Sequence, residues 1–317
     1  MIKVSVIVPV HNSQDYLGTC LGNLVHQTLS EIELILVDDA STDQSLEILY
    51  ECQKQFPDKV KVIPLAQNAG PGGARNAGIM AAQGEYIGFT DSDDIVDPSM
   101  YEKLYQQAKV LDCDMVDCGF YNQKEDQAIL YTSDELTGEL DDRKRAELIV
   151  SGGYLWSRIF KSEIIKNDPH YHFREHAILE DSDFLTYAYG TMHRIGNVKE
   201  ILYQYSYHPQ NISESNTENP YKYHDNICNA INALMKLTPD LCQGIMVRKA
   251  VEYEVIQMYL YGMINCLKNL EDTEFQAENR MMHLKQIKDN YLRIPYDENE
   301  YILSKITGDN YALLQQL

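Results

Sequence analysis

The chain has 317 residues, enough for one large domain or a large and a small one, and 44% of them are hydrophobic, which allows a sizeable core. With 48 acidic against 27 basic side chains the formal net charge is −21, which opposes nucleic-acid binding. It also disfavours a polyanionic ligand unless a divalent cation bridges that ligand to the protein. The apolar runs are too short to span a bilayer, and the seven cysteines show no paired spacing, so we expect reduced thiols in a cytoplasmic protein.

Predicted strands and helices alternate through the first hundred residues. A β-branched run from Val4 to Val10 predicts a buried strand that leads into a polar turn. Apolar residues at helical spacing predict the helix that follows, with Ser13 as its cap. The pattern repeats in the predicted strands 33–37, 59–65 and 86–90 and in the helices between them. Such alternation predicts a parallel sheet, which places ligands at the carboxyl ends of its strands.

The remainder of the chain gives a helix after Pro98 and a strand at 114–120, whereas residues 121–142 have no clear assignment. Beyond Asn216 the apolar residues follow helical periodicity. We therefore predict an α/β domain over residues 1–216 and a helical region over residues 217–317, with turn residues alone marking the boundary.

Acidic residues stand directly after two of the predicted strands. Asp38 and Asp39 follow the second strand, and the run Asp91 to Asp94 follows the fourth. Clustered carboxylates repel one another unless a cation or hydrogen bonds hold them ionised. An oxygen-only group suits Mg²⁺ or Mn²⁺, which take further ligands from substrate phosphates. Turns and helix caps would also explain these residues, so both interpretations stay open at this point.

Four segments together resemble family 2 glycosyltransferases in their order and spacing. They are Val6 to Asn12 (VIVPVHN), Leu36 to Asp43 (LVDDASTD), Asn68 to Gly78 and Gly84 to Asp94 (GEYIGFTDSDD). The resemblance implies a GT-A fold for residues 1–216, a Rossmann-like α/β architecture with a mostly parallel sheet flanked by helices. It also implies inverting transfer of a sugar from a nucleotide diphosphosugar with Mn²⁺ or Mg²⁺. A carboxylate at Asp39 can accept the imide N–H of uracil or thymine, which favours a UDP-sugar over a GDP-sugar, while a dTDP-sugar would satisfy the same contact.

The resemblance assigns roles to individual residues of the donor site. Those expected to bind the nucleotide-sugar are Pro9, Val10, His11, Asn12, Asp39, Asn68, Gly70, Arg75, Asp91, Ser92 and Asp93. Pro9 and His11 would frame the base, and His11 stands where the family often has tyrosine. Asp93 would be the direct metal ligand, with Asp91 near the ribose and the metal.

A weaker resemblance continues at 155–162 and 178–184. It matches Asp181 to the family's general base, with Glu180 to orient the acceptor or to replace the base. Acidity at a helix N-terminus would also explain this pair. Trp156 would stack on an acceptor sugar or fill the core.

The resemblance further implies a glycan or lipid-linked acceptor. Peripheral association with the inner face of the membrane and a homodimer contact stay open. The alternative is a non-catalytic nucleotide-sugar-binding or scaffold protein of the same fold, against which the presence of both Asp93 and Asp181 argues.

Overall fold

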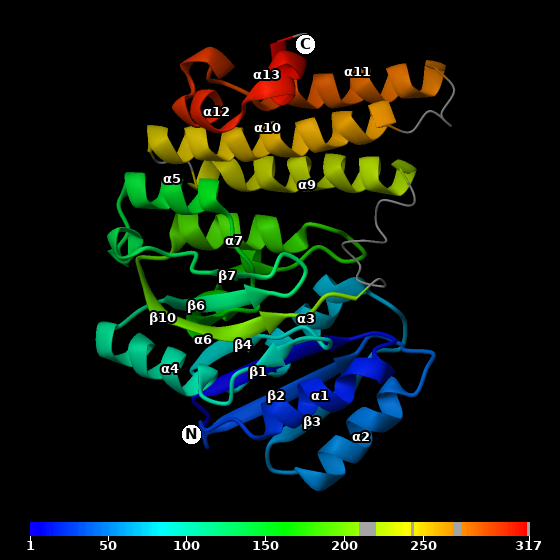
Figure 1. Ribbon diagram of the computed structural model, residues 1–317, viewed down its shortest axis with the longest axis vertical. Coiled ribbons are helices and arrows are strands. Elements are labelled where there is room, and N and C mark those ends of the chain that lie inside the picture. Colours follow the sequence, from blue (N-terminus) through cyan, green and yellow to red (C-terminus); the bar gives the residue numbers. More distant parts are fainter. Residues whose placement is uncertain (209–219, 242–243, 269–273, 316–317) are drawn as a thin grey trace. The chain divides into compact units, whose positions relative to one another are not determined.

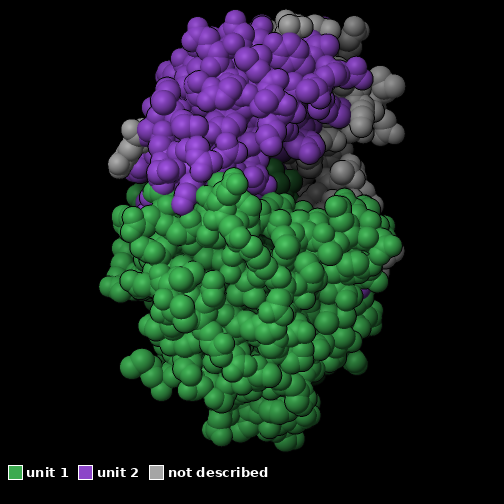
Figure 2. Space-filling model, turned by 60° about the vertical axis from the view of Figure 1, so that its left-hand side comes forward, with its two compact units in different colours: residues 1–140, 153–184, 192–207 green, residues 141–152, 185–191, 208–317 purple. Residues whose placement is uncertain are grey.

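The computed structural model describes residues 1–208, 220–241, 244–268 and 274–315. The described chain divides into two compact units, coloured separately in Figure 2. Unit 1 comprises residues 1–140, 153–184 and 192–207, and unit 2 comprises 141–152, 185–191 and the described residues from 208 onward. The boundary predicted between residues 216 and 217 lies outside the described residues. Within those ranges, no helix combines the length and the apolar character needed to cross a membrane.

Unit 1 contains a ten-stranded sheet in the order β3-β2-β1-β4-β9-β6-β10-β5, with β7 paired to β6 and β8 paired to β10. The strands are β1 (Val4–Val10), β2 (Ile32–Asp38), β3 (Val60–Pro64), β4 (Tyr86–Phe89), β5 (Ile95–Val96), β6 (Met115–Asn122), β7 (Gln127–Ile129), β8 (Gly138–Glu139), β9 (Arg158–Lys161) and β10 (Arg194–Tyr205). The neighbours from β3 to β4 all run parallel, as do β6 and β10, whereas β9 is antiparallel to both of its neighbours. The predicted α/β class with a mostly parallel sheet is confirmed.

Helices cover both faces of this sheet (Figure 1). They are α1 (Gln14–Val25), α2 (Ser45–Gln55), α3 (Gly70–Ala81), α4 (Met100–Leu111), α6 (Ser162–Asn167) and the beginning of α7 (Glu180–Thr191), with short 3₁₀ turns η1 (Asp134–Leu136) and η2 (Pro169–Tyr171). Alternate residues of a strand point to opposite faces. Accordingly, Val6 and Val8 of β1 join the core that contains Leu17 of α1, whereas Ile7 lies against Gly78 of α3. Each such buried apolar side chain contributes about 1.5–3 kcal/mol.

Unit 2 is helical in its described part. Its elements are α5 (Asp142–Ser151), the rest of α7, α9 (Pro220–Leu241), α10 (Ile245–Lys268), α11 (Glu274–Tyr291), η4 (Tyr296–Glu298), α12 (Glu300–Lys305) and α13 (Gly308–Gln315). α10 packs against α5, α9 and α11. Asp142 accepts the backbone N–H groups of Met246 at 3.1 Å and Val247 at 3.3 Å, so a side chain of α5 caps the N-terminus of α10. The helical character predicted beyond residue 216 is confirmed for the described residues.

Candidate active site

The turns after β1 and β2 lie side by side at the carboxyl edge of the sheet, because the two strands pair in parallel register along their whole length. His11 Nδ1 lies 2.9 Å from the carbonyl oxygen of Asp39. The backbone N–H of Asn12 donates to Ser41 Oγ at 3.1 Å. Predicted donor-site residues from two different strand ends are therefore neighbours in the structure.

Asp39 orders the loop that leads into α3. Its side chain is buried, Oδ1 accepts the backbone N–H of Ala69 at 2.6 Å, and Oδ2 accepts the side-chain amide of Asn68 at 2.9 Å. Each carboxylate oxygen has a second lone pair, so Asp39 keeps acceptor capacity for a ligand N–H. Asp38 instead accepts the backbone N–H of Ser41 at 3.2 Å and closes its own turn. Asp39 thus orders the loop before α3, whereas Asp38 stabilises the turn after β2.

The beginning of α3 lies against residues 173–176, which precede α7. Gly70 has a φ of 75°, and a Cβ at this position would come within 3.1 Å of the backbone nitrogen of His176. Asn76 pairs with the backbone of Phe173 like a strand neighbour: its Nδ2 donates to the carbonyl oxygen and its Oδ1 accepts the N–H, both at 2.9 Å. The approach to α7 is therefore fixed to the loop that Asp39 orders.

Arg75 joins carboxylates from two distant parts of the chain. Its Nη1 donates to Glu180 Oε1 at 2.6 Å, and its Nη2 donates to Asp91 Oδ1 at 3.1 Å. The side chains of Arg75 and Glu180 are only 8% and 9% exposed. Burial alone would lower the pKa of Arg75, but the charges of Asp91 and Glu180 outweigh it and raise the pKa. The first turn of α7 is thereby anchored to the turn after β4.

Ser13 does not cap α1, contrary to the prediction. It stands at the N-cap position, but its hydroxyl makes no cap hydrogen bond. Its Oγ donates instead to the carbonyl oxygen of His11 at 3.2 Å and lies 2.8 Å from Ser92 Oγ. Ser13 therefore connects the turn after β1 with the turn after β4, a long-range role that local spacing does not reveal.

Asp94 is the buried member of the acidic turn after β4. Its Oδ2 accepts the hydroxyl hydrogen of Tyr203 at 2.6 Å, and its Oδ1 accepts the backbone N–H of Ser206 at 2.7 Å. The Tyr203 oxygen in turn accepts the backbone N–H of Asp91 at 3.3 Å. Burial, followed by the charges of Asp91 and Asp93, raises the pKa of Asp94. Asp94 thus fixes the turn to β10.

The turn after β4 fits a divalent cation that shares its ligands with a substrate. Asp91 and Asp93 are half-buried and keep access to solvent. A cation would relieve the repulsion that these carboxylates exert on Asp94. Among the described residues, no three carboxylates of this turn bring their oxygens close enough to enclose a cation by themselves. Mg²⁺ and Mn²⁺ commonly use one or two carboxylates, waters and substrate phosphates, which suits this donor set.

Asp181, the predicted general base, is an acid with a raised pKa. It lies in the first turn of α7 and is half-buried. Burial, followed by the charge of Glu180, raises the pKa of Asp181 to about 7, although Arg75 opposes the shift. A carboxyl that titrates near neutrality is a stronger base than an exposed aspartate. Burial also raises the pKa of Asp183, which lies in the same helix turn and is paired with Arg174.

Strained backbone surrounds these side chains. Asn12, Ala40, His176 and Leu179 have φ values of 51°, 54°, 51° and 60°. The left-handed conformation is unfavourable for residues other than glycine, at a cost on the order of 1–3 kcal/mol each. The first two follow β1 and β2, and the last two precede α7. Two more residues of this kind, Asp112 and Asp126, lie elsewhere, so four of the six in the described part of the chain flank the candidate site.

Trp156 is a core residue. It is 5% exposed, and its ring stacks on Tyr203 at 4.3 Å and on Tyr154 at 4.7 Å between centroids. Its ring surface is covered, so an acceptor sugar cannot stack on it without displacing a tyrosine. Of its two predicted roles, the structure favours the core. Tyr154 is 37% exposed and offers the accessible ring of this stack.

The segments that form this edge of the sheet all fall within the match to one protein family. The sequence model described as Glycosyl transferase family 2 matches residues 5–171, just over half of the chain. The chain belongs to this family. The match covers the turns after β1, β2 and β4 and ends before Glu180 and Asp181, so the family assignment does not depend on these two acids.

Curated relatives of this family 2 chain include the uncharacterized glycosyltransferase EpsJ of Bacillus subtilis, which is 34% identical over a 229-residue alignment that covers 69% of this chain and 64% of EpsJ. Glycosyltransferase GlyG of Streptococcus pneumoniae is 43% identical over 128 residues, which are 40% of this chain and 42% of GlyG. The chain therefore matches less than two thirds of the length of each of these relatives.

Solved structures confirm the predicted GT-A fold. S. aureus TarS 1-349, solved in complex with UDP, has a TM-score of 0.58 and 20% identity, with 92% of this chain and 91% of that chain covered. The mannosyltransferase PcManGT from Pyrobaculum calidifontis, in complex with GDP-Man and Mn²⁺, has a TM-score of 0.57 and 15% identity, with 99% and 79% covered. At these identities the likeness shows the fold alone.

One residue that stabilises the family 2 site, Arg174, was not among the site residues predicted from the sequence. Arg174 donates from Nε and Nη2 to the two carboxylate oxygens of Asp183 at 2.7 and 2.9 Å, and its Nη2 also donates to the carbonyl oxygens of Ile178 and Leu179. This fork holds the beginning of α7. The sequence signal was weak, because a basic residue nine positions before an acid implies contact only once the turn between them is known.

Proposed function

We propose that the protein is an inverting glycosyltransferase that moves a sugar from a UDP-sugar to a hydroxyl group, assisted by a divalent cation. The contact that carries this proposal is the double ion pair of Arg75, which joins Asp91 of the donor-side turn to Glu180, the neighbour of Asp181. Arg75 thus links the proposed metal-binding turn to the helix turn of the proposed base, and all of these residues lie in unit 1. Unit 1 is accordingly the proposed catalytic domain.

The turns after β1 and β2 form the proposed nucleotide site. Pro9 and His11 would frame the base, and Asp39 would accept its imide N–H through the lone pairs that Ala69 and Asn68 leave open. Uracil offers that N–H, whereas adenine does not. The neighbours named above support the ligand class, since TarS has been solved with UDP and UDP-GlcNAc and PcManGT with GDP-Man.

Asp93 is the proposed direct metal ligand, with Asp91 beside it. Asp91 is paired with Arg75, and Asp94 accepts the hydroxyl hydrogen of Tyr203. The resemblance to the family is what assigns the direct ligand to Asp93, which is half-buried in the same turn. A bound Mn²⁺ or Mg²⁺ would offset the negative charge of the leaving diphosphate.

Asp181 is the proposed base that takes the proton of the acceptor hydroxyl. Attack of that oxygen on the anomeric carbon opposite the diphosphate inverts its configuration. Glu180 is paired with Arg75 and therefore positions the helix turn and the acceptor instead of accepting the proton itself. The acceptor class is proposed to be a glycan or a lipid-linked glycan. Relatives are named for acceptors as different as poly(ribitol-phosphate) and cholesterol, which supports a hydroxyl acceptor.

The test is UDP release from UDP-glucose, UDP-galactose and UDP-GlcNAc, with Mn²⁺ and a lipid-linked glycan extract, from pH 5 to pH 9. We expect release that requires Mn²⁺ and falls about tenfold per pH unit below about pH 7, because Asp181 must lose its proton to act. A rate independent of pH between 5 and 7 would exclude Asp181 as the base. Binding of UDP without release from any donor would favour the non-catalytic alternative.

A further inference from the structure

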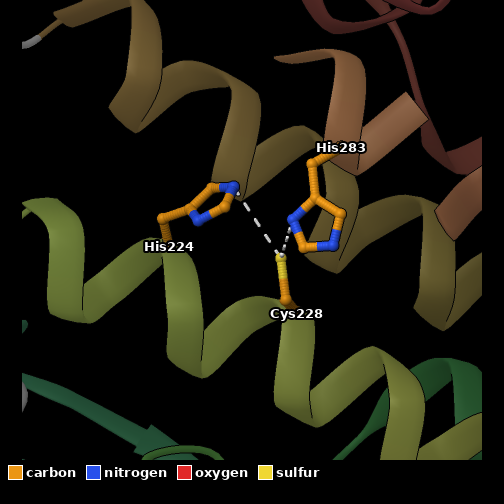
Figure 3. Close-up of side chains that lie close together, drawn as sticks. All are labelled: His224, Cys228 and His283. Atoms are coloured by element: carbon orange, nitrogen blue, oxygen red, sulfur yellow. Dashed lines mark hydrogen bonds between the residues drawn. The ribbon is translucent and has the colours of Figure 1, made fainter. Parts of the chain in front are cut away.

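Unit 2 brings two histidines and a cysteine together on facing helices. His224 and Cys228 lie four residues apart on α9, which puts them on one face of the helix, and His283 comes from α11. Cys228 Sγ lies 3.8 Å from His224 Nε2 and 3.8 Å from His283 Nδ1. Figure 3 shows the three side chains directed toward one another. Their ligand atoms all lie within 4.8 Å of each other.

The two sulfur–nitrogen distances suit a tetrahedral metal ion. Zinc binds a thiolate at about 2.3 Å and an imidazole nitrogen at about 2.0–2.1 Å, which places sulfur and nitrogen about 3.5 Å apart at a tetrahedral angle. The two separations in the structure, both 3.8 Å, exceed that value by a few tenths of an ångström. Small side-chain rotations close a difference of this size. A pair of imidazoles with a thiolate selects zinc-like transition ions over the oxygen-seeking Mg²⁺ and Mn²⁺.

The surroundings of His224 support a ligand role. Its Nδ1 lies 3.3 Å from Asp225 Oδ1. With Nδ1 protonated toward this carboxylate, Nε2 presents its lone pair to Cys228, which is the tautomer that a metal-binding histidine needs. His224 and Cys228 are 6% and 5% exposed, while His283 is exposed. The cluster is therefore closed by protein on the α9 side and open at His283, which leaves room for ion entry and for a fourth ligand.

We propose that His224, Cys228 and His283 form a zinc site that links α9 to α11, with a water molecule as the fourth ligand. Three protein ligands and a water complete a four-coordinate shell. The site would stabilise the helical unit, since an ion bound only by the folded state raises apparent stability. It uses nitrogen and sulfur ligands in unit 2, whereas the proposed catalytic cation uses carboxylates of unit 1. The zinc proposal is therefore independent of the glycosyltransferase mechanism.

The test is a titration of the metal-stripped full chain with Co²⁺, which reports sulfur ligation through a thiolate-to-cobalt charge-transfer band and tetrahedral geometry through its visible bands. We expect both bands to saturate at a single equivalent, to disappear on addition of Zn²⁺ and to persist in excess Mn²⁺. A wild-type chain without a saturable charge-transfer band overturns the proposal. A binding constant unaffected by Mn²⁺ also separates this site from the turn after β4.

Matched substitutions identify the residues that produce the thiolate-to-cobalt charge-transfer band. Cys228→Ser should abolish the charge-transfer band, and His283→Ala should weaken Co²⁺ binding by at least about tenfold. Cys52→Ser and His26→Ala, which alter a half-buried cysteine and an exposed histidine of unit 1, should leave both bands unchanged. Zn²⁺ should raise the melting temperature of the wild-type chain but not of Cys228→Ser, with circular dichroism to show that the variant keeps its helices. A band that survives Cys228→Ser, or disappears in Cys52→Ser, contradicts the assignment.

Discussion

Asp181→Asn is expected to slow sugar transfer by about 10²–10⁴-fold, the usual contribution of a general base. Asparagine keeps the size of the side chain but cannot accept the hydroxyl proton. The donor contacts at Asp39 and the turn after β4 remain, so the affinity for UDP with Mn²⁺ should change by less than about twofold. Steady-state rates and calorimetric UDP titrations on the same preparation separate the two effects. Unchanged transfer would remove Asp181 as the base.

The pH dependence of unfolding provides a control that Asp181→Asn is correctly folded. The pKa of Asp181 is raised to about 7 in the folded protein, so the folded protein binds this proton more tightly than the unfolded chain does. The resulting penalty is absent below the unfolded pKa of about 4, grows as the pH rises, and reaches at most about 4 kcal/mol above pH 7. Asp181→Asn should therefore unfold at a higher denaturant concentration than wild type at pH 8 and not at pH 4. A loss of activity caused by misfolding would give the opposite result.

Arg75→Ala is expected to lower the free energy of unfolding by about 3–5 kcal/mol, the typical cost of leaving a buried charge without its partner. The substitution removes both hydrogen bonds of the guanidinium and leaves the 9%-exposed side chain of Glu180 uncompensated. It also frees the beginning of α7 from the turn after β4, so transfer should fall as well. Urea unfolding at pH 7.5 measures the stability change.

A double-mutant cycle isolates the ion pair. Glu180→Gln removes the charge that Arg75→Ala leaves unpaired, so the double variant should be more stable than Arg75→Ala alone. Arg75→Lys should lie between wild type and Arg75→Ala, because an ammonium group keeps the charge but cannot present a fork to both carboxylates. A cost below about 1 kcal/mol for Arg75→Ala would show that the pair is not a structural link.

The sequence predicted those parts of the fold and site that depend on local pattern. Runs such as Val4 to Val10 define the strands, and the parallel order of the strands brings the residues after β1, β2 and β4 to one edge of the sheet. The donor-side turns could therefore be located from spacing. The roles proposed for them rest on the resemblance to the family and stay predictions until binding is measured.

The remaining features depend on contacts between distant segments. Asp142 caps α10, Arg174 donates two hydrogen bonds to Asp183, and Tyr203 donates one to Asp94. No periodic pattern in the sequence indicates any of these contacts. Residues 121–142 had no clear assignment from sequence because, between the end of β6 at Asn122 and the start of α5 at Asp142, the chain forms only the short elements β7, η1 and β8. The pairing of β7 and β8 comes from β6 and β10. The prediction that Ser13 caps α1 was wrong because its hydroxyl contacts Ser92, which is distant in the sequence.

The most direct test of the central claim, a cation-dependent UDP site in unit 1, is a thermal-shift titration of UDP with and without Mn²⁺, with GDP and Asp93→Asn as comparisons. A ligand raises the melting temperature only through its preference for the folded state, by an amount equivalent to about 2.7 kcal/mol at a hundredfold excess over Kd. We predict a clear increase with UDP and Mn²⁺ together and almost none with UDP alone or in Asp93→Asn, while the GDP titration measures how strongly the site selects its base. An increase that does not depend on Mn²⁺ or on Asp93, or none at all, would contradict the proposed donor site.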